Sequence, residues 1–182
     1  MIAVAGLAGA GKTTACEFLD SAKMGRRFYA GVVLHEELRR RGLEANPKNE
    51  RFVRSQLRQA DGEEVFARRA LPKVEAMLAQ GPVFLDAVYC QSELVCYRSL
   101  SVPVYVMAIE TARALRVERL AGRDERSMSD GDLAKRDELE LGTIGLGKVL
   151  ADANFIVRND GNLVEFEEIV GRSVAEVPGF PA

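Results

Sequence analysis

A glycine-rich segment near the start of the chain has the spacing of a loop that binds phosphate groups. It reads Gly6-Leu7-Ala8-Gly9-Ala10-Gly11-Lys12-Thr13, the pattern G-x-x-x-x-G-K-[ST]. Glycines permit the positive φ angles that turn backbone amides toward a polyphosphate. Lys12 then faces the β- and γ-phosphates of a nucleoside triphosphate, and the Thr13 hydroxyl is expected to bind Mg²⁺. The expected nucleotide-binding residues are Gly6, Gly9, Ala10, Gly11, Lys12, Thr13 and Thr14.

A carboxylate ends a later apolar run, Val83-Phe84-Leu85-Asp86. If this run is a parallel strand beside the strand that carries the loop, Asp86 faces the phosphates. It would then hold Mg²⁺ or accept a proton from an attacking group; the alternative is that it only caps a helix. Ala87 and Val88 follow Asp86, so the glutamate that activates water in motor ATPases is missing, and the chain has no Asn-Lys-x-Asp guanine motif. These absences favour phosphoryl transfer to a bound acceptor over hydrolysis.

Arginines gather in a polar, glycine-containing stretch that is typical of a loop closing over a site. Arginines that close over a transferring phosphoryl group stabilise its charge and exclude water. We expect catalytic roles for Lys12 and Asp86 and for two of these arginines: Arg123, which lies in the loop, and Arg136, which is expected to pair with Asp137. The arginines of this stretch are Arg116, Arg119, Arg123, Arg126 and Arg136.

More arginines occur between residues 39 and 69 than a small helical segment needs. A guanidinium binds phosphate through two parallel hydrogen bonds, so a phosphorylated acceptor would use such residues. Arg39, Arg54 and Arg69 are the expected acceptor-binding residues. Asn159, in a turn after a late apolar run, is expected either to present its backbone to the adenine or to form a plain turn. The lone His35 is interpreted as structural.

Short apolar runs alternate with helical patterns, which predicts an α/β fold with a five-stranded parallel sheet covered by helices on both faces. Expected strands lie at 2–5, 28–34, 82–86, 104–109 and 155–158, with the first strand central. Thr111 is expected to cap the helix that follows the fourth strand. We expect a single domain over 1–182, with a core (1–30, 76–121 and 143–182), a helical insertion at about 31–75 and a lid at about 122–142.

Composition excludes several classes of protein. The 182 residues carry a net charge of -2 with 7% aromatic residues, which argues against a nucleic-acid-binding surface. No apolar run approaches the roughly 18 residues that span a bilayer, so no membrane association is expected. Cys16, Cys90 and Cys96 lack metal-ligand spacing and are interpreted as reduced thiols, which predicts a cytoplasmic protein.

Taken as an ordered set, these motifs resemble the P-loop nucleoside and nucleotide kinases, the superfamily of adenylate kinase and dephospho-CoA kinase, and most closely an archaeal branch of kinase-like proteins. The resemblance implies ATP and Mg²⁺, a three-layer α/β/α fold, an acceptor-binding insertion and an arginine-bearing lid. It rests on the loop 6–14 and on segments 36–43, 67–72, 85–86, 119–126, 135–137 and 152–161.

Two departures from these relatives fall in the acceptor region. The relatives often have Gly-Asp where this chain has Gly31-Val32, and Gly with a nearby arginine where Asp86 is followed by Ala87-Val88-Tyr89-Cys90. A different or less charged acceptor is therefore expected.

The leading hypothesis is an ATP-dependent phosphotransferase that acts on a nucleoside or deoxynucleoside monophosphate, or on a related phosphorylated metabolite such as dephospho-CoA. Two alternatives remain open at this point: a nucleotide-binding switch or weak ATPase that acts through a partner protein, and a kinase of a modified nucleotide in a polynucleotide.

Overall fold

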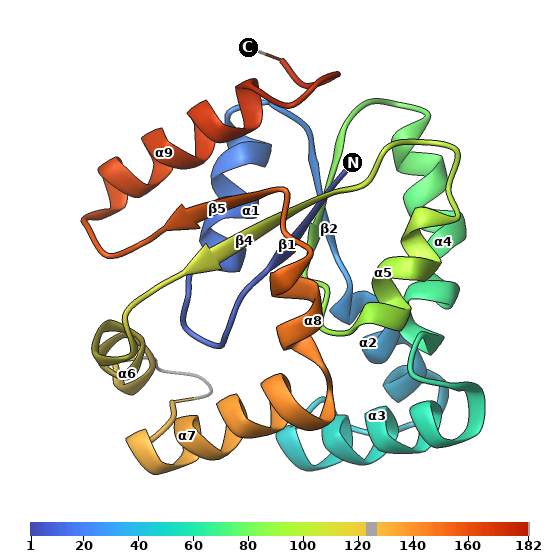
Figure 1. The fold of residues 1–182 in the computed structure, drawn as a ribbon. Helices are drawn as coiled ribbons and strands as arrows, with labels where there is room; N and C mark the ends of the chain where they lie inside the picture. The colour runs from blue at the N-terminus through green and yellow to red at the C-terminus, as the bar shows by residue number, and fades with distance from the viewer. Residues whose placement is uncertain (123–126, 182) are drawn as a thin grey trace.

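A five-stranded parallel sheet lies at the centre of the computed structural model, which describes residues 1–122 and 127–181 (Figure 1). The strand order is β2-β3-β1-β4-β5. The strand that leads into the glycine-rich loop is therefore central, as predicted. Its neighbour β3 pairs with it in parallel, with Val4 opposite Asp86, so both strands end at the same edge of the sheet. The strands are β1 (Ile2–Ala5), β2 (Arg26–Tyr29), β3 (Val83–Asp86), β4 (Tyr105–Glu110) and β5 (Phe155–Arg158).

Alternation along β1 explains why helices cover both faces of the sheet. Successive strand side chains point to opposite faces, and Ile2 and Val4 belong to one buried cluster whereas Ala3 and Ala5 belong to another. The first cluster packs under α1 and α9, the second under α4, α5 and α8. The three-layer α/β/α fold is thus confirmed. These helices are α1 (Lys12–Ser21), α4 (Val65–Leu78), α5 (Gln91–Arg98), α8 (Leu146–Ala151) and α9 (Leu163–Ala175).

Two groups of helices lie beyond the carboxyl edge of the sheet. One group comes between β2 and β3. Its helix α3 starts with Asn46 as the N-cap residue and Pro47 in the first turn, a combination typical of helix starts. The other group follows β4. Its helix α7 is capped by Ser129, whose hydroxyl accepts a hydrogen bond from the Asp132 amide at 3.1 Å. Figure 1 shows α3 and α7 at the same end of the molecule. The remaining helices are α2 (Gly31–Arg40), α3 (Pro47–Asp61), α6 (Arg113–Ala121), α7 (Asp130–Glu138) and the π-helical η1 (Leu139–Thr143).

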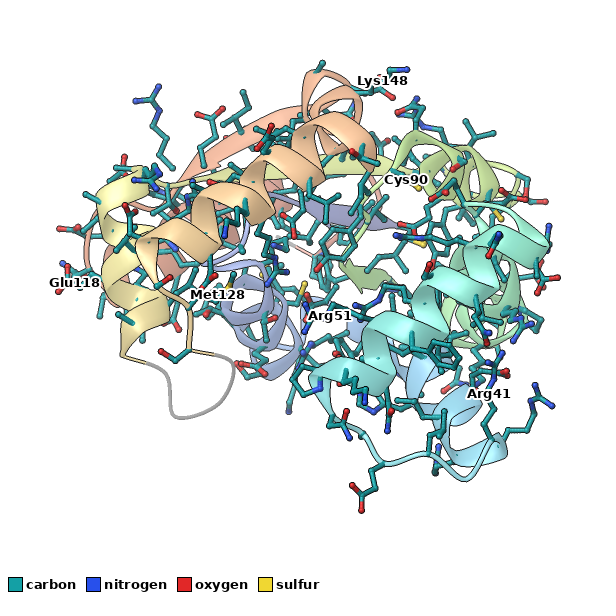
Figure 2. All side chains as sticks on the ribbon, turned by 90° about the horizontal axis from the view of Figure 1, so that it is seen from below. Arg41, Arg51, Cys90, Glu118, Met128 and Lys148 are labelled. Atoms are coloured by element: carbon teal, nitrogen blue, oxygen red, sulfur yellow. The ribbon has the colours of Figure 1, made fainter. Side chains whose placement is uncertain are left out.

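Seen from that end, α3 and α7 lie next to each other across the carboxyl edge of the sheet (Figure 2). Arg51 of α3 lies at the gap between the two helices, whereas Arg41 lies on the outer side of α3. Within the described part of the chain, no helix is both long and apolar enough to cross a membrane. The three cysteines are free thiols.

The second strand was predicted at the wrong residues. It begins at Arg26 instead of Phe28 and ends at Tyr29, because Arg26 pairs with Val83 in the parallel ladder. The apolar residues after Gly31 form the buried face of α2, where Val33, Leu34, Glu37 and Leu38 recur at helical spacing. The prediction missed the true start of β2 because this edge strand begins with two charged residues, Arg26 and Arg27.

The predicted cap of α6 is also wrong. The residue that precedes the helix is Ala112, which has no capping side chain, because the Thr111 hydroxyl donates to the Ala10 carbonyl at 3.0 Å. Thr111 therefore holds the glycine-rich loop by a hydrogen bond and does not cap the helix.

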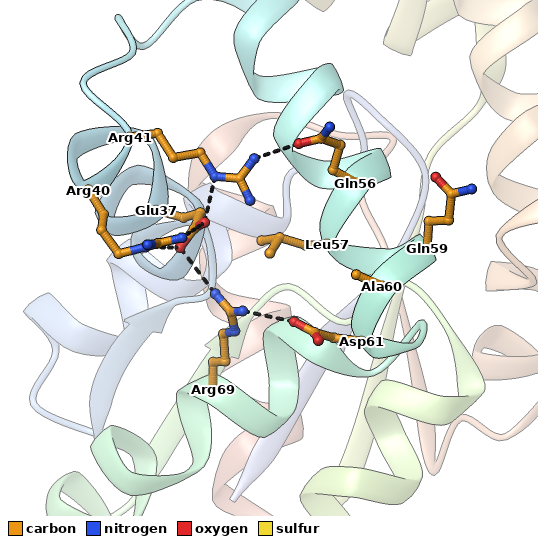
Figure 3. A pocket seen from close by; sticks show the side chains of 9 residues that line it. All are labelled: Glu37, Arg40, Arg41, Gln56, Leu57, Gln59, Ala60, Asp61 and Arg69. Atoms are coloured by element: carbon orange, nitrogen blue, oxygen red, sulfur yellow. Dashed lines mark hydrogen bonds and ion pairs between the residues drawn. The ribbon is translucent and has the colours of Figure 1, made fainter.

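A buried carboxylate ties the insertion helices together. Glu37 on α2 accepts from Arg40 Nη2 at 2.6 Å, from Arg41 Nε at 2.6 Å and from Arg69 Nη1 of α4 at 3.2 Å (Figure 3). Hydrogen bonding by Arg40 lowers the pKa of Glu37 to about 2, against the opposing effect of burial. These side chains, with Asp61 and others of α3, line a hollow of about 450 Å³.

We predict that Glu37→Gln lowers the free energy of unfolding by roughly 1–3 kcal/mol at pH 7, because three guanidinium groups lose their shared carboxylate. The folded pKa is depressed from an ordinary value of 4.5, so this stabilisation is full above about pH 4.5 and is lost as the pH falls toward 2. Urea unfolding at pH 7 and at stepwise lower pH measures both effects.

Glu36→Gln is the matched control, because the Glu36 carboxylate is 45% exposed and contacts only the exposed Lys73 among the ion pairs of the described residues. We expect it to change the free energy of unfolding by less than about 0.5 kcal/mol. A difference between wild type and Glu37→Gln that stays constant from pH 7 to pH 3 would contradict the prediction.

Candidate functional site

The glycine-rich loop joins β1 to α1 and adopts backbone angles that other residues rarely take. Gly11 has φ of 105°, and a Cβ atom there would lie 2.3 Å from Asn159 Nδ2. Gly6 has φ of 151°, and its Cβ would lie 2.6 Å from the Ile109 carbonyl oxygen. Both positions require glycine for its conformation and for its lack of a side chain. The loop is therefore packed closely against β4 and the turn after β5.

One carbonyl of the loop is held by an arginine from α6. Arg116 Nη1 donates to the Ala8 carbonyl at 3.1 Å, and the same guanidinium binds Asp137 of α7 through two hydrogen bonds, of 2.9 and 2.6 Å. A trans peptide is planar, so the Gly9 amide on the same peptide points the opposite way. Arg116 is buried, with 4% of its surface exposed. Arg116 therefore connects the loop to α7 through its hydrogen bonds.

A second carbonyl of the loop is held by two side chains. Asn159 Nδ2 donates to Ala10 O at 2.8 Å, and Thr111 donates to the same oxygen at 3.0 Å. By the same planarity, the Gly11 amide points away from these partners. It also stands at the N-terminus of α1, where the helix dipole favours an anion. The Gly9 and Gly11 amides therefore point away from the side chains that hold the Ala8 and Ala10 carbonyls.

The Lys12 ammonium is held by two carbonyls at the start of the loop. Its Nζ donates to Gly6 O at 2.7 Å and to Leu7 O at 3.0 Å, and lies 5.7 Å from the centre of the Tyr89 ring. Lys12 is buried, with 9% of its surface exposed. Its phosphate-facing role stays a prediction.

The structure brings Asp86 and Thr13 together, as the sequence predicts for a magnesium site. Thr13 Oγ1 donates to Asp86 Oδ1 at 3.3 Å. The other carboxylate oxygen, Oδ2, accepts from Arg27 Nε at 3.0 Å and from Arg27 Nη2 at 2.7 Å. The residue before α5 is Cys90, so the Asp86 side chain does not cap that helix. Sequence reasoning missed Arg27 because its strand was expected to start at Phe28.

The oxygen atoms of Thr13 and Asp86 fit Mg²⁺, a hard cation that takes oxygen ligands and keeps several of its waters. Among the described residues, no cluster of three or more His, Cys, Asp or Glu side chains forms a metal site. A metal held by these two residues would therefore complete its shell with water and phosphate oxygens.

A hollow of about 320 Å³ lies beside the loop, on the side of α9. Arg119 Nη2 borders it and donates to the Asn159 backbone oxygen at 3.1 Å. The Asn159 side chain is therefore a support of the loop, while its backbone oxygen is already paired with Arg119. The hollow is lined by Gly9, Gly11, Thr14, Arg119, Asn159, Gly161, Leu163 and Phe166.

On the other side of the loop, residues from three segments meet around Tyr89. Burial raises the pKa of Tyr89 to about 12, with a further rise from Glu140 and an opposing effect of Arg136. Burial lowers the pKa of Arg54, and Glu50 and Tyr89 partly offset this effect. The charges of Arg54 on α3 and Arg136 on α7 both lower the pKa of Tyr89, whereas the charge of Asp86 raises it.

Arg136 has a different partner from the one expected. Its Nε donates to Glu140 Oε1 at 2.7 Å, while the Asp137 carboxylate is taken by Arg116. Burial alone would lower the pKa of Arg136, but Glu140 reverses this and the pKa is raised. The expected pairing of Arg136 with Asp137 is wrong because adjacent residues of a helix point in directions about 100° apart.

The structure does not gather all the expected acceptor residues. Arg69 binds Glu37 at 3.2 Å and Asp61 at 2.8 Å in the hollow of Figure 3. That hollow touches Gln56 and Ala60 of α3, which lie about 160° and 120° around the helix from Arg54, and Arg54 does not line it. Arg39 is exposed on α2. Arg123, an expected catalytic residue, lies outside the described residues.

Comparison with known structures supports the same fold. The crystal structure of TT1252 from Thermus thermophilus aligns with a TM-score of 0.63 at 18% identity, covering 98% of this chain and 97% of that one. A shikimate kinase from Acinetobacter baumannii, solved with shikimate, aligns with a TM-score of 0.57 at 16% identity, covering 96% and 90%. A gluconokinase from Sinorhizobium meliloti aligns with a TM-score of 0.59 at 14% identity and the same coverage.

Comparison of sequences identifies the family. A family model described as an AAA domain matches residues 2–140. A UPF0200 protein of Methanothrix thermoacetophila is 33% identical over 174 residues, covering 92% of both chains. Another, of Hyperthermus butylicus, is 32% identical over 182 residues, covering 98% of this chain and 95% of the relative. The chain therefore belongs to the UPF0200 family, within the P-loop NTPase and kinase superfamily that its fold and loop indicate.

Proposed function

We propose that this protein is an ATP-dependent phosphotransferase that moves the γ-phosphoryl group of ATP to a small phosphorylated acceptor. The observation that carries the proposal is the hydrogen bond from Thr13 to Asp86 at the loop; Arg54 and Arg136 lie close enough to Tyr89 for their charges to lower its pKa. A donor site and a cationic acceptor side thus share one space at the carboxyl edge of the sheet.

The reaction follows from this arrangement. An acceptor oxygen attacks the γ-phosphorus, the bond to the β–γ bridging oxygen breaks, and ADP leaves with that electron pair. Loop amides and Lys12 hold the β- and γ-phosphates, and Arg136 stabilises charge on the γ-phosphoryl oxygens. Mg²⁺, when bound at Thr13 and Asp86, would neutralise part of the polyphosphate charge. An acceptor phosphate is ionised at neutral pH because its second pKa is about 6, so attack by it needs no general base. An acceptor that reacts through a hydroxyl, such as dephospho-CoA, would pass its proton to Asp86.

The segments then have distinct roles in the proposal. Residues 31–75, which hold α2, α3 and most of α4, are the proposed acceptor-binding insertion, and the stretch 122–142, which includes α7, is the proposed lid. Arg54 is the acceptor anchor that faces the shared space. A nucleoside or deoxynucleoside monophosphate, or dephospho-CoA, fits a site with arginine anchors and the half-buried Tyr89. The kinases of shikimate and gluconate with the same fold make small hydroxylated acids useful further acceptors to assay.

The AAA description of the matching family model raises hydrolysis as the competing activity. Ala87 and Val88 follow Asp86, so no carboxylate stands directly after it to activate water. Hydrolysis without an acceptor is therefore expected to be slow. Rapid release of phosphate from ATP that no acceptor accelerates would favour the ATPase instead.

The first test measures ADP formation from ATP and Mg²⁺ with each nucleoside monophosphate, dephospho-CoA, shikimate or gluconate. We expect one class of acceptor to stimulate ADP release and to gain a phosphate detectable by mass spectrometry. Lys12→Ala should lower kcat by about 100-fold or more, because the phosphates lose a buried ammonium. Lys148→Ala is the matched control, since Lys148 is exposed on α8, and turnover that survives in Lys12→Ala would refute the site.

The second test separates the two arginines that meet at Tyr89. Arg136→Ala is expected to lower kcat by roughly 100-fold or more while the KM for ATP changes little, because its charge is needed at the transition state. Arg54→Ala is expected to raise the KM for the acceptor by roughly 10-fold, the loss of one charge-assisted hydrogen bond. Steady-state kinetics with both substrates varied gives these constants.

Arg69→Ala serves as the control for Arg54→Ala. Arg69 faces the hollow on the outer side of α3, so its loss should lower the unfolding temperature without a selective rise in acceptor KM. Equal effects of Arg54 and Arg69 on acceptor KM would show that the acceptor anchors have been placed on the wrong side of α3.

A further inference from the structure

Arg27 contacts the candidate magnesium ligand directly from a neighbouring strand. It lies on β2, and its guanidinium reaches Asp86 at the end of β3 with Nε at 3.0 Å and Nη2 at 2.7 Å from the same oxygen. The two side chains are 23% and 4% exposed. Nothing in the glycine-rich loop or in the segment after Asp86 points to this contact, because it is formed only by the pairing of β2 with β3.

The two oxygens of Asp86 are divided between two partners. Oδ2 accepts from Arg27, and Oδ1 accepts from Thr13 Oγ1 at 3.3 Å. Arg27 therefore does not compete with Thr13 for the same oxygen. Holding one oxygen fixes the rotation of the carboxylate, and this leaves the other oxygen toward Thr13 and the phosphate side of the loop.

Arg27 is itself held from other directions. Its Nη1 donates to Glu17 Oε1 of α1 at 2.8 Å, and its guanidinium lies 5.6 Å from the centre of the Tyr29 ring. Burial, the largest single effect, would lower the pKa of Arg27, but the hydrogen bond to Asp86 and the charges of Asp86 and Glu17 together raise it. The guanidinium is thus charged, partly shielded from water and fixed in orientation, which are properties of a residue that orients another.

Two simpler roles make different predictions. A purely structural tie between β2 and β3 would affect folding but not metal binding. A cation placed near a metal site would repel Mg²⁺, so its removal would strengthen metal binding. Residues that orient a metal ligand typically change metal affinity by roughly 10- to 100-fold when they are lost. The sign of the change in magnesium dependence therefore separates the three roles.

We propose that Arg27 is a positioning residue for magnesium, which holds Asp86 by one oxygen so that the other faces Thr13 and the bound triphosphate. This inference rests on the proposed function, because it assumes that a magnesium–nucleotide complex binds at the loop. It adds a residue of β2 to a site that otherwise comes from β1, α1 and β3.

The experiment uses the full chain and a non-hydrolysable ATP analogue with an imido β–γ bridge. Calorimetry measures analogue affinity in EDTA and across a Mg²⁺ titration, for wild type, Arg27→Lys and Arg27→Gln. Arg27→Lys keeps the charge but loses the pair of hydrogen bonds that converge on Asp86 Oδ2, whereas Arg27→Gln loses the charge as well. Arg26→Gln is the matched control, because Arg26 is the preceding residue of the same strand and its Nη1 contacts the exposed Gln80.

We expect both Arg27 variants to need about 10-fold more Mg²⁺ for half of the magnesium-dependent gain in affinity. Affinity in EDTA should stay within about twofold of wild type, and Arg26→Gln should match wild type throughout. Glu17→Gln removes a carboxylate that holds Arg27 but leaves Asp86 unchanged. It should raise the required Mg²⁺ concentration by a smaller factor, and it replaces the Arg27 variants in the test if both of them fail to fold.

Three outcomes overturn the inference. If the magnesium dependence of the Arg27 variants is unchanged, Arg27 only links β2 to β3. If Arg27→Gln needs less Mg²⁺ than wild type, the charge of Arg27 repels the metal. In both cases the proposed function stands, because wild type still binds the magnesium–nucleotide complex. A wild-type protein that binds no triphosphate, with or without Mg²⁺, would overturn the proposed function together with this inference.

Discussion

The orientation of a few peptide groups between β1 and α1 governs the candidate site. A loop can offer its amides to phosphate only if its carbonyls have partners elsewhere, because each planar peptide points the two groups in opposite directions. Here Arg116 takes the carbonyl of Ala8, and Asn159 and Thr111 take that of Ala10. These supports come from α6, the end of β4 and the turn after β5. The nucleotide half of the site thus depends on elements more than 100 residues away along the chain.

The central place of β1 follows from the same requirement. With β3 on one side and β4 on the other, the loop receives the metal-ligand candidate Asp86 from one neighbour and its bracing residues from the other. Parallel pairing brings these strand ends to one edge of the sheet. The chemistry is therefore concentrated where the strand order reverses, and the buried faces below it need only apolar side chains.

The side proposed to bind the acceptor has a different construction. Its charged groups come from α3, α7 and η1, and their charges act on the half-buried Tyr89. The Glu37 cluster lies on the other side of α3 and joins α2 to α4. One set of arginines thus lies near Tyr89, and another joins α2 to α4. This division explains how one short segment can be rich in arginine without every guanidinium serving the acceptor.

The sequence alone determined the glycine-rich loop, the roles open to Lys12 and Thr13, and the α/β class, because these depend on spacing within a few residues and on local periodicity. The central place of the first strand followed from where that loop lies. The pairing of Asp86 with Arg27, by contrast, was decided only by the register of β2 against β3. The same holds for Arg116 bracing Ala8, and for Arg69 pairing with Glu37 while Arg54 faces Tyr89. A long cationic side chain can satisfy its charge on many partners with similar energy, so only the packed fold selects the one it meets.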